Sequence, residues 1–508
     1  MAELSINGRD LTIEQVVKVA DDPGIVVTIA PDAIPGINRA AEAVQQFIRE
    51  GRIAYGITTG FGAFKDKLIS VNEVEKLQEN IILSHAVGVG PTLDDRTVRA
   101  MMLIRANTLA KGHSGIRLQT IQLLLALLNH NILPIIPSKG SLGASGDLAP
   151  LAHMSLPMLG IGQVKMDGQL IDANEALQRV DLAPIQLAAK EGLALTNGTT
   201  MMTALGALLV DGAESLIRSA NCAGALTIEA QNGTQRAFLT QLHDARPQKF
   251  QVETAAQIRS LLQGSQLTRP DDSSNVQDAY TLRCIPQVHG AVHSVIDYAR
   301  SVVETELNSV TDNPLLFFDQ DGNVEIISGG NFHGEPLAFA LDFLAIALTD
   351  LGNMSERRIA KLIDINTELY PPFLAARGGL NSGFMLLQYT AAALTSENKT
   401  LSHPSSVDSI PSSGNVEDHV SMGANAANHC VQVLENVISI VAIEIMAAAQ
   451  AIDFRLLEDS TLQLGAGTTV AMRKAREIVP FFDKDAFVQP YLLELTDLVT
   501  SGGFCKLG

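Results

Sequence analysis

Cysteine is scarce in this chain, and its few copies stand far apart. Only four cysteines occur in 508 residues, and none of them forms a Cys-x-x-Cys pair. Neither a zinc ribbon nor a disulfide framework is therefore indicated, and we expect reduced thiols. The N-terminal residues also lack the basic start and the apolar run of a secretory signal peptide. Together these absences predict a cytoplasmic protein.

Basic residues are few as well. Lys and Arg number 36 against 55 Asp and Glu, which gives a formal net charge of −19. Nucleic acids and anionic membranes are bound through basic surfaces, so neither is an expected partner. The long apolar segment 437–452 is interrupted by Glu444, which predicts a buried helix rather than a membrane span. No P-loop and no dinucleotide fingerprint occur, so no nucleotide is expected.

Hydrophobic residues, in contrast, are plentiful. They make up 46% of the chain, against 18% charged residues. A chain of this length exceeds what one core usually holds, and a chain this apolar often buries more surface by oligomerising. The predicted fold is mainly α, with long packed helices in a central bundle and an irregular N-terminal part that contains loops and hairpins. Three regions are expected: N-terminal residues 1–200, the helix bundle 201–480 and a C-terminal segment 481–508.

Local patterns predict several individual elements. Thr12 and Gln15 form a capping-box pattern that begins a helix. Asn-Gly and Asp-Gly pairs predict tight turns in three hairpins, over residues 4–11, 164–171 and 316–327. Residues 336–353 have leucines that step by three and four, with phenylalanine and isoleucine on another face. This pattern predicts a helix that is apolar most of the way round and belongs in a core.

The most unusual stretch is residues 140–153, Gly-Ser-Leu-Gly-Ala-Ser-Gly-Asp-Leu-Ala-Pro-Leu-Ala-His. Its glycines allow a tightly shaped turn before a helix. In such a turn the amide nitrogen of Gly146 can attack the carbonyl carbon of Ala144. Loss of water, including the Ser145 hydroxyl, then leaves an exocyclic alkene on a five-membered ring. An ordinary loop that leads into a helix is the alternative.

Several polar and aromatic side chains fit a helical core poorly and stand in or beside predicted loops. They are Tyr55, His85, Asn197, Tyr280, Arg283, Phe332 and Glu417. With the Gly-Ala-Ser-Gly-Asp-Leu-Ala-Pro-Leu-Ala-His motif, this set resembles the aromatic amino acid ammonia-lyases, the family of histidine, phenylalanine and tyrosine ammonia-lyases. The resemblance extends from the Tyr-Gly-Ile-Thr-Thr-Gly-Phe-Gly block at 55–62 to Ser-Met at 421–422.

The resemblance implies a cofactor that the chain makes itself. In this family the Ala-Ser-Gly triplet cyclises autocatalytically into a methylidene-imidazolone, here from Ala144, Ser145 and Gly146. This electrophile makes the α-amino group of the substrate a better leaving group, and neither a metal nor a nucleotide is required. The resemblance also implies a homotetramer in which loops of more than one subunit build each active site.

The family pattern assigns roles to matching residues. It implies that Tyr55 is the base at the β-carbon of the substrate, with a pKa that must fall from about 10. Asn197 would contact the ring and the substrate, and Arg283 would grip the substrate carboxylate. Taken alone, Arg283 could instead pair an internal acid, and Tyr280 could pack in a core. The remaining family positions are Gln277 and Tyr280, in one typical block, and Phe332, which would line the pocket.

Two positions bear on the substrate. Ser84-His85 matches the histidine-specific pattern, in which the His can hydrogen-bond an imidazole ring, whereas tyrosine enzymes resemble His-Leu and phenylalanine enzymes Phe-Leu. Histidine-specific members carry Glu at the position of Glu417, where the others usually carry Gln. A carboxylate holds an imidazole by a charge-assisted hydrogen bond but gains nothing from a phenyl ring. These positions predict elimination of ammonia from L-histidine to give urocanate.

Some departures keep other functions open. Val416 replaces the usual Gln, Thr58 stands where many members have Asn, and the block 196–202 is closer to aromatic-specific members. The alternative is a tyrosine or phenylalanine ammonia-lyase, or an aminomutase that re-adds ammonia at the β-carbon. More remote are a serine hydrolase acting through Ser145, disfavoured by the absence of Gly-x-Ser-x-Gly, and a non-catalytic helical scaffold.

Overall fold

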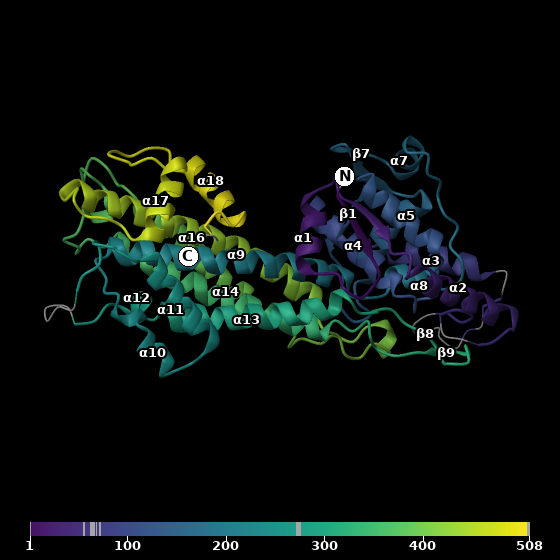
Figure 1. Ribbon diagram of the computed structural model, residues 1–508. Coiled ribbons are helices and arrows are strands. Elements are labelled where there is room, and N and C mark those ends of the chain that lie inside the picture. The colour runs from purple at the N-terminus through teal and green to yellow at the C-terminus, as the bar shows by residue number, and fades with distance from the viewer. Residues whose placement is uncertain are drawn as a thin grey trace. The chain divides into compact units, whose positions relative to one another are not determined.

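The computed structural model describes residues 2–53, 56–60, 67, 69–70, 73–270 and 276–504. Within these residues the chain is mainly α-helical with a few small sheets, as predicted (Figure 1). It divides into two compact units, each assembled from three separate stretches of sequence. Unit 1 comprises residues 1–211, 299–342 and 404–428, and unit 2 comprises residues 212–298, 343–403 and 429–508.

The elements of unit 1 are mostly short. They are β1 (Glu3–Ile6), α1 (Ile13–Asp21), β2 (Val26–Ile29), α2 (Ile34–Arg49), α3 (Val74–His85), β3 (Val89–Thr92), α4 (Asp95–Ala110), α5 (Leu118–Asn129), β4 (Leu133–Pro134), β5 (Pro137–Lys139), α6 (Leu148–Ser155), β6 (Gln163–Met166), β7 (Gln169–Asp172), α7 (Ala173–Arg179), α8 (Glu191–Thr196), β8 (Leu315–Phe318) and β9 (Val324–Ile327).

Unit 2 is built around long helices. Its own elements are α10 (Thr240–Asp244), α11 (Lys249–Leu261), α12 (Tyr280–Arg283), α15 (Met385–Leu401), α17 (Ala466–Ile478) and α18 (Gln489–Thr500). Four further helices contain residues of both units: α9 (Thr200–Ala230), α13 (Ile285–Leu307), α14 (Glu335–Leu362) and α16 (Gly423–Glu458).

Two of the three predicted hairpins and the predicted capping box are confirmed. The strands β6 and β7, and likewise β8 and β9, pair in antiparallel fashion around their Asp-Gly turns. At the start of α1, the Thr12 hydroxyl accepts a hydrogen bond from the Gln15 amide, and the Gln15 side chain accepts one from the Thr12 amide. Both orphan amides of the helix end are thus satisfied locally.

The predicted hairpin over residues 4–11 is wrong. Strand β1 pairs in parallel with β2, and α1 connects the two strands. The backbone amides that follow the Asn-Gly turn are bound by asparagine side chains: the Gly8 amide donates to Asn107, and the Leu11 amide donates to Asn308, both at 2.9 Å. Because these amides have tertiary partners, no return strand forms, and the chain enters the helix directly.

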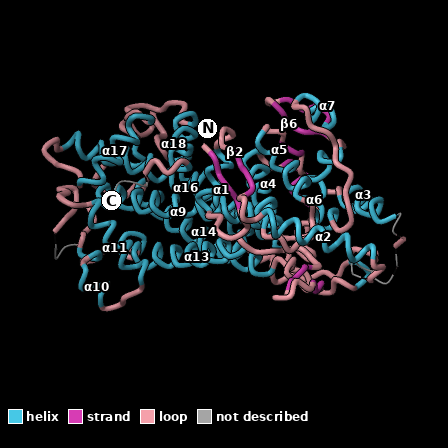
Figure 2. Tube along the Cα trace, turned by 45° about the vertical axis from the view of Figure 1, so that its right-hand side comes forward, coloured by secondary structure: helices cyan, strands magenta, loops and turns pink. Residues whose placement is uncertain are grey.

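Within unit 2, segments of α9, α13, α14 and α16 run side by side (Figures 1 and 2). Their polar contacts meet at Glu444 of α16, which accepts hydrogen bonds from Arg358 of α14 at 2.6 and 2.9 Å and from Thr227 of α9 at 2.7 Å. The Arg358 and Glu444 side chains are fully buried. A buried ion pair needs such additional hydrogen bonds to offset desolvation, and here it ties three long helices together.

Three helices, α9, α14 and α16, are long and apolar enough to cross a membrane by length and composition. Between 67% and 89% of the most apolar window of each helix is buried inside the protein. The predicted buried helix 437–452 lies in α16, and most of its residues are buried. The apolar surface of these helices is therefore largely covered by the chain itself.

The prediction for residues 336–353 is right about the helix and wrong about one of its faces. In α14 the leucine stripe, which includes Leu337 and Leu344, is fully buried. The other apolar stripe, Phe339, Phe343 and Ile346, is between 41% and 46% exposed. The chain therefore covers this face only in part, for example where the ring centroids of Tyr298 and Phe343 lie 6.1 Å apart.

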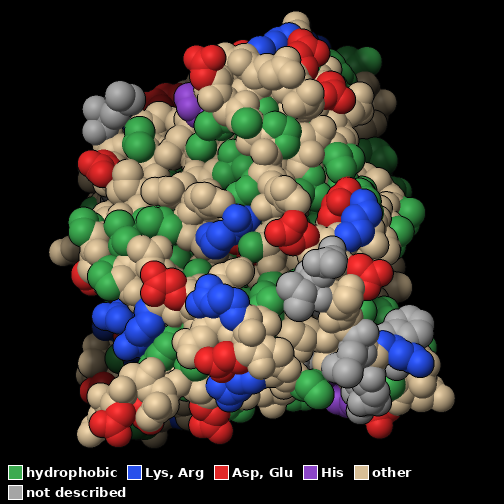
Figure 3. Space-filling view, turned by 90° about the vertical axis from the view of Figure 1, so that its right-hand side faces the viewer, with side chains coloured by type: hydrophobic (Ala, Val, Ile, Leu, Met, Phe, Trp, Pro, Cys, Tyr) green, Lys and Arg blue, Asp and Glu red, His purple; other side chains and the backbone are tan. Residues whose placement is uncertain are grey.

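Charged side chains of both signs are mixed on one face of the protein (Figure 3). On the face drawn in Figure 3, Lys and Arg side chains are scattered among Asp and Glu, with apolar and uncharged residues between them. No continuous basic area is visible among the described residues of that face.

Candidate active site

The Ala144-Ser145-Gly146 turn is held against the Asn197-Gly198 turn that precedes α9. The Asn197 side-chain amide donates to the Ser145 carbonyl at 2.7 Å. The Asp147 amide donates to the Gly198 carbonyl at 2.7 Å, and the Gly198 amide to the Ser145 carbonyl at 3.4 Å. Three hydrogen bonds therefore fix the backbone on both sides of Gly146, which restrains the turn to one shape.

Close packing makes glycine necessary at Gly146. Its φ is +72°, in the left-handed region. A Cβ atom added there would collide with the carbonyl group of Gly198. Gly143 has a φ of +70°, and a Cβ atom there would collide with the Ser421 hydroxyl. The turn is thus as tight as the sequence predicts, and its cradle accepts a residue without a side chain at each of these positions.

A buried acid and a buried base support the turn from behind. Asp147 is fully buried and accepts hydrogen bonds from the Met202 amide at 3.0 Å and the Ser141 hydroxyl at 3.1 Å. Burial raises the pKa of Asp147 to about 7, against the opposing hydrogen bonds and the charge of Arg105. Burial also lowers the pKa of Arg105 to about 10. The Arg105 guanidinium donates to the Asn197 carbonyl at 2.7 Å, so it braces the second turn.

A large cavity of about 1410 Å³ opens beside the triplet. All of its described lining residues belong to unit 1. They come from α3, from the triplet and the start of α6, from the Asn197 turn, and from two loops, 328–333 and 412–419. Among the predicted site residues, the cavity is lined by Ser84, His85, Ala144, Ser145, Asn197, Phe332 and Glu417.

Glu417 links the triplet to the substrate-selecting positions. One carboxylate oxygen, Oε1, accepts a hydrogen bond from the Ser145 hydroxyl at 2.7 Å, and Oε2 accepts one from the Ser412 hydroxyl at 2.9 Å. Burial lowers the pKa of His85, and the nearby charge of Glu417 partly opposes this. The Ser84 hydroxyl lies 3.0 Å from His85 Nδ1. A carboxylate and a neutral imidazole thus line the same cavity next to the triplet.

The other predicted residues are not gathered here. Tyr55 lies outside the described residues. Gln277, Tyr280 and Arg283 belong to unit 2, and none of them lines the described wall of the cavity. Tyr280 is 69% exposed, and the Arg283 guanidinium lies 4.4 Å from the centre of its ring. Arg283 also donates to the Asp278 carbonyl at 3.0 Å. Gln277 and Tyr280 are exposed in unit 2, and Arg283 is half-buried beside Tyr280.

The sequence reasoning missed the charged residues behind the turn. Asp147 was expected only to begin a helix, yet its side chain makes no cap and is buried instead. Lys190 and Asp312 form a fully buried ion pair at 2.5 Å, and burial lowers the pKa of Lys190. A signal existed for Arg105, because it stands in α4 among apolar residues that are almost all buried. A charge inside such a helix indicates a buried partner.

Comparison with known proteins finds relatives over nearly the whole length. Residues 11–477 match the family described as aromatic amino acid lyase. The histidine ammonia-lyase of Chloroflexus aurantiacus is 57% identical over 505 residues, which cover 98% of this chain and 97% of that protein. The crystal structure of histidine ammonia-lyase from Trypanosoma cruzi is similar with a TM-score of 0.91 and 40% identity, covering 99% of this chain and 94% of that chain.

An aminomutase shares the fold equally well. The structure of a tyrosine aminomutase from Streptomyces globisporus is similar with a TM-score of 0.93 and 38% identity, covering all of this chain and 98% of that chain. The fold is thus common to proteins with different reaction outcomes. The reaction outcome, elimination or amino-group migration, therefore depends on the residues around the cavity. The chain is 57% identical to the histidine ammonia-lyase of C. aurantiacus and 38% identical to the tyrosine aminomutase.

Proposed function

The chain belongs to the aromatic amino acid lyase family, and on that premise we propose that this carbon–nitrogen lyase eliminates ammonia from L-histidine and releases urocanate. The observation that carries the choice of substrate is the pair His85 and Glu417 beside Ser145 in one cavity. An imidazole ring offers an N–H to the carboxylate and a second nitrogen to His85. A phenyl or phenol ring would leave the Glu417 carboxylate desolvated without this compensation.

Ala144, Ser145 and Gly146 supply the methylidene-imidazolone in this proposal. The fit rests on the left-handed Gly146, whose position excludes a Cβ atom, and on the three hydrogen bonds that hold the turn. Once formed, the group supplies an electrophile that turns the α-amino group of the substrate into a better leaving group. Asn197 keeps the Ser145 carbonyl in place, and Phe332 covers the cavity wall beside it.

Ring formation would also free an acceptor for the substrate. In the unmodified turn, Glu417 Oε1 accepts the hydrogen bond of the Ser145 hydroxyl. Dehydration removes that hydroxyl, so Oε1 loses its partner while Oε2 keeps the Ser412 hydroxyl. The oxygen that loses its donor is on the cavity side of the turn, where an imidazole N–H of the substrate can replace it. Glu417 thus selects the substrate only after the cofactor has formed.

The remaining predicted residues complete the proposed machinery. Tyr55 removes the β-proton, Arg283 binds the substrate carboxylate, Gln277 contacts the substrate, and Tyr280 acts as a further catalytic residue. We propose that these last three act on the active site of another subunit, in a homotetramer with shared sites. The exposure of Gln277 and Tyr280 in unit 2 supports this arrangement, as does the half-exposed apolar stripe of α14.

The proposal assigns a separate role to each of the three predicted regions of the chain. Residues 1–200 carry the base loop and the ring, residues 201–480 form the long-helix bundle, and residues 481–508 form a C-terminal segment. A cytoplasmic location is also proposed, because the chain has only four widely spaced cysteines and no Cys-x-x-Cys pair. The substrate is a small amino acid, and no metal or nucleotide takes part in the elimination.

The test combines product analysis with the mass of the intact chain. The purified protein is supplied in turn with L-histidine, L-tyrosine and L-phenylalanine, and the products are identified by liquid chromatography. Urocanate from histidine is expected, together with a chain mass reduced by two water molecules; Ser145→Ala should abolish both. Coumarate, cinnamate or a β-amino acid as the main product would overturn the substrate or the outcome, and an unmodified mass with full activity would overturn the cofactor.

A further inference from the structure

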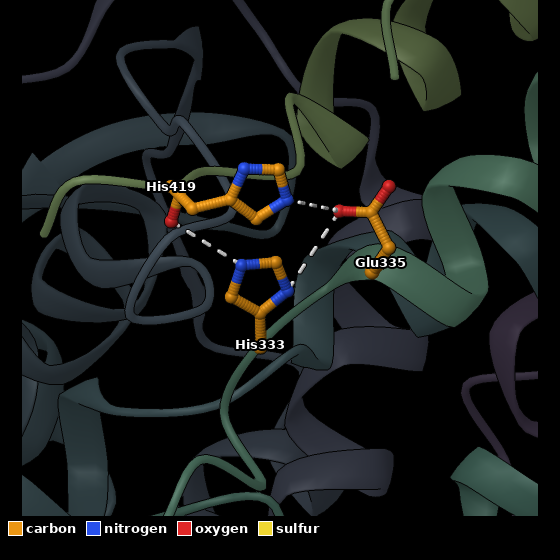
Figure 4. Close-up of side chains that lie close together, drawn as sticks. All are labelled: His333, Glu335 and His419. Atoms are coloured by element: carbon orange, nitrogen blue, oxygen red, sulfur yellow. Dashed lines mark hydrogen bonds and ion pairs between the residues drawn. The ribbon is translucent and has the colours of Figure 1, made fainter. Parts of the chain in front are cut away.

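A cluster of two histidines and a glutamate lies beside the cavity, and the two histidines line the cavity wall. His333 belongs to the loop before α14, Glu335 is the first residue of α14, and His419 belongs to the loop before α16. Figure 4 shows both imidazole rings and the carboxylate converging on one point. The ligand-type atoms of all three side chains lie within 4.8 Å of one another. All three residues belong to unit 1.

The hydrogen bond of one ring defines which nitrogen faces the carboxylate. His333 Nε2 lies 3.4 Å from the His419 carbonyl oxygen, which can only accept, so Nε2 carries the proton. In the neutral ring Nδ1 is then unprotonated, and its lone pair points at Glu335 Oε2, 3.9 Å away. A backbone carbonyl that holds the second nitrogen of a histidine is the usual support of a metal-binding imidazole.

Within the described part of the chain, the Glu335 carboxylate lacks a hydrogen-bond donor on one of its oxygens. Among the described residues, Glu335 Oε2 is buried and accepts no hydrogen bond. Two imidazole nitrogens lie near this oxygen, His333 Nδ1 at 3.9 Å and His419 Nε2 at 3.8 Å, both too distant for hydrogen bonds. A cation among the three atoms would be bound by both nitrogens and by the carboxylate oxygen.

We propose that His333, Glu335 and His419 form a binding site for a divalent transition metal ion of the zinc class. Four-coordinate zinc has bonds of about 2.0–2.2 Å, which separates neighbouring ligand atoms by about 3.4 Å. The two separations between a histidine nitrogen and Glu335 Oε2, 3.9 and 3.8 Å, therefore need to close by about 0.5 Å. The separation between the two imidazole nitrogens, at most 4.8 Å, needs to close by about 1.4 Å at most, and the exposed His419 leaves room for this movement. Two imidazoles and one carboxylate favour zinc, cobalt or nickel over magnesium or calcium, which prefer oxygen ligands.

The remaining coordination position would face the cavity, because His333 and His419 both line it. The ion would join the 328–333 loop and the first residue of α14 to the 412–419 loop. It would thereby connect the two segments that carry Phe332 and Glu417. The positive end of α14 opposes a cation at this place, which makes the charge of Glu335 essential. The inference rests on this geometry alone and holds or fails independently of the proposed elimination reaction.

The test uses the full-length protein, with any affinity tag removed and with bound ions stripped by a chelator. Titration with Co²⁺ is followed by visible absorption, and titration with Zn²⁺ by calorimetry, in the absence of amino acids that chelate metals. One ion per chain is expected, with the intense visible bands of four-coordinate Co²⁺. Glu335→Gln, which keeps the shape of the side chain, should weaken binding about 100-fold or more, since even outer-shell changes cost 10- to 100-fold.

His333→Ala and His419→Ala should have effects of the same size, and the exposed His130 provides the matched control, because His130→Ala removes a histidine elsewhere in unit 1. Unchanged circular dichroism of Glu335→Gln shows that lost binding is not lost folding. The proposal is overturned by absence of binding, by equal binding in Glu335→Gln and the original chain, or by near-ultraviolet thiolate bands that assign the ion to a cysteine.

Discussion

Replacing Glu417 by Gln separates the two tasks that the structure gives to this carboxylate. Its oxygens accept hydrogen bonds from the Ser145 and Ser412 hydroxyls at 2.7 and 2.9 Å. Gln has the same shape and keeps one acceptor, and a serine hydroxyl can turn to accept from the new amide group. Folding and ring formation should therefore lose about 1 kcal/mol at most. The mass of the Glu417→Gln chain should still be reduced by two water molecules.

Substrate recognition should suffer much more. A hydrogen bond to a charged group contributes about 1.5–3 kcal/mol, which corresponds to a factor of about 10 to 150. We therefore expect kcat/KM for L-histidine to fall by about 10- to 150-fold in Glu417→Gln, because the neutral amide replaces the charged acceptor of the imidazole N–H. Urocanate formation, followed by its ultraviolet absorbance, measures this change.

The control for loss of a carboxylate is Glu175→Gln, because Glu175 lies on the surface of unit 1 in an exposed pair with Arg179. It should change kcat/KM by less than about twofold, since exposed pairs contribute little. A similarly small change in Glu417→Gln with the ring intact would refute the assignment of Glu417 to the substrate. Loss of the ring mass in Glu417→Gln would instead show that the carboxylate is needed for cyclisation.

Three further variants test the surroundings of the site and the bundle. Gly198→Ala should reduce the fraction of chains with the ring mass about fivefold or more, because an added Cβ meets neighbouring atoms at 2.6 and 2.7 Å, whereas Gly168→Ala, at a φ of +77° in open space, should not. Arg358→Met should lower the thermal midpoint by several degrees, since it leaves Glu444 charged and buried at a cost of about 3–5 kcal/mol; an unchanged midpoint would contradict the role of this pair. The stabilisation that comes from the raised pKa of Asp147 is complete below the ordinary pKa of 3.8 and is lost as the pH rises through about 7, so the thermal midpoint should fall over this pH range. In Asp147→Asn the thermal midpoint should fall less over the same range, and an equally steep fall would contradict the role of Asp147.

Local sequence determined the parts of the fold whose partners are neighbours in the chain. The capping box of α1 and the two Asp-Gly hairpins need only residues within a few positions of one another, so their patterns predicted them correctly. The hairpin over residues 4–11 failed for the opposite reason. Its amides found Asn107 and Asn308, and the position of such distant side chains is invisible in a local pattern.

The same distinction applies to the exposed face of α14. Periodicity showed that residues 336–353 are helical and that two faces are apolar, but burial depends on which surfaces meet. The leucine stripe is fully buried within the chain, whereas the Phe339, Phe343 and Ile346 stripe is covered only in part. A sequence pattern reports that a face can be buried, and only the folded chain reports whether one copy of the protein suffices to bury it.

For the site, the sequence by itself determined the chemistry that is available. The Ala-Ser-Gly triplet, with glycine where an amide nitrogen must be unhindered, allows one unusual ring, and His85 and Glu417 suit an imidazole. Only the tertiary structure decided that these residues share a cavity, that Glu417 binds the hydroxyl of Ser145, and that buried charges brace the turn. The physical reason is distance along the chain: residues 145 and 417 are 272 positions apart, and no local interaction relates them.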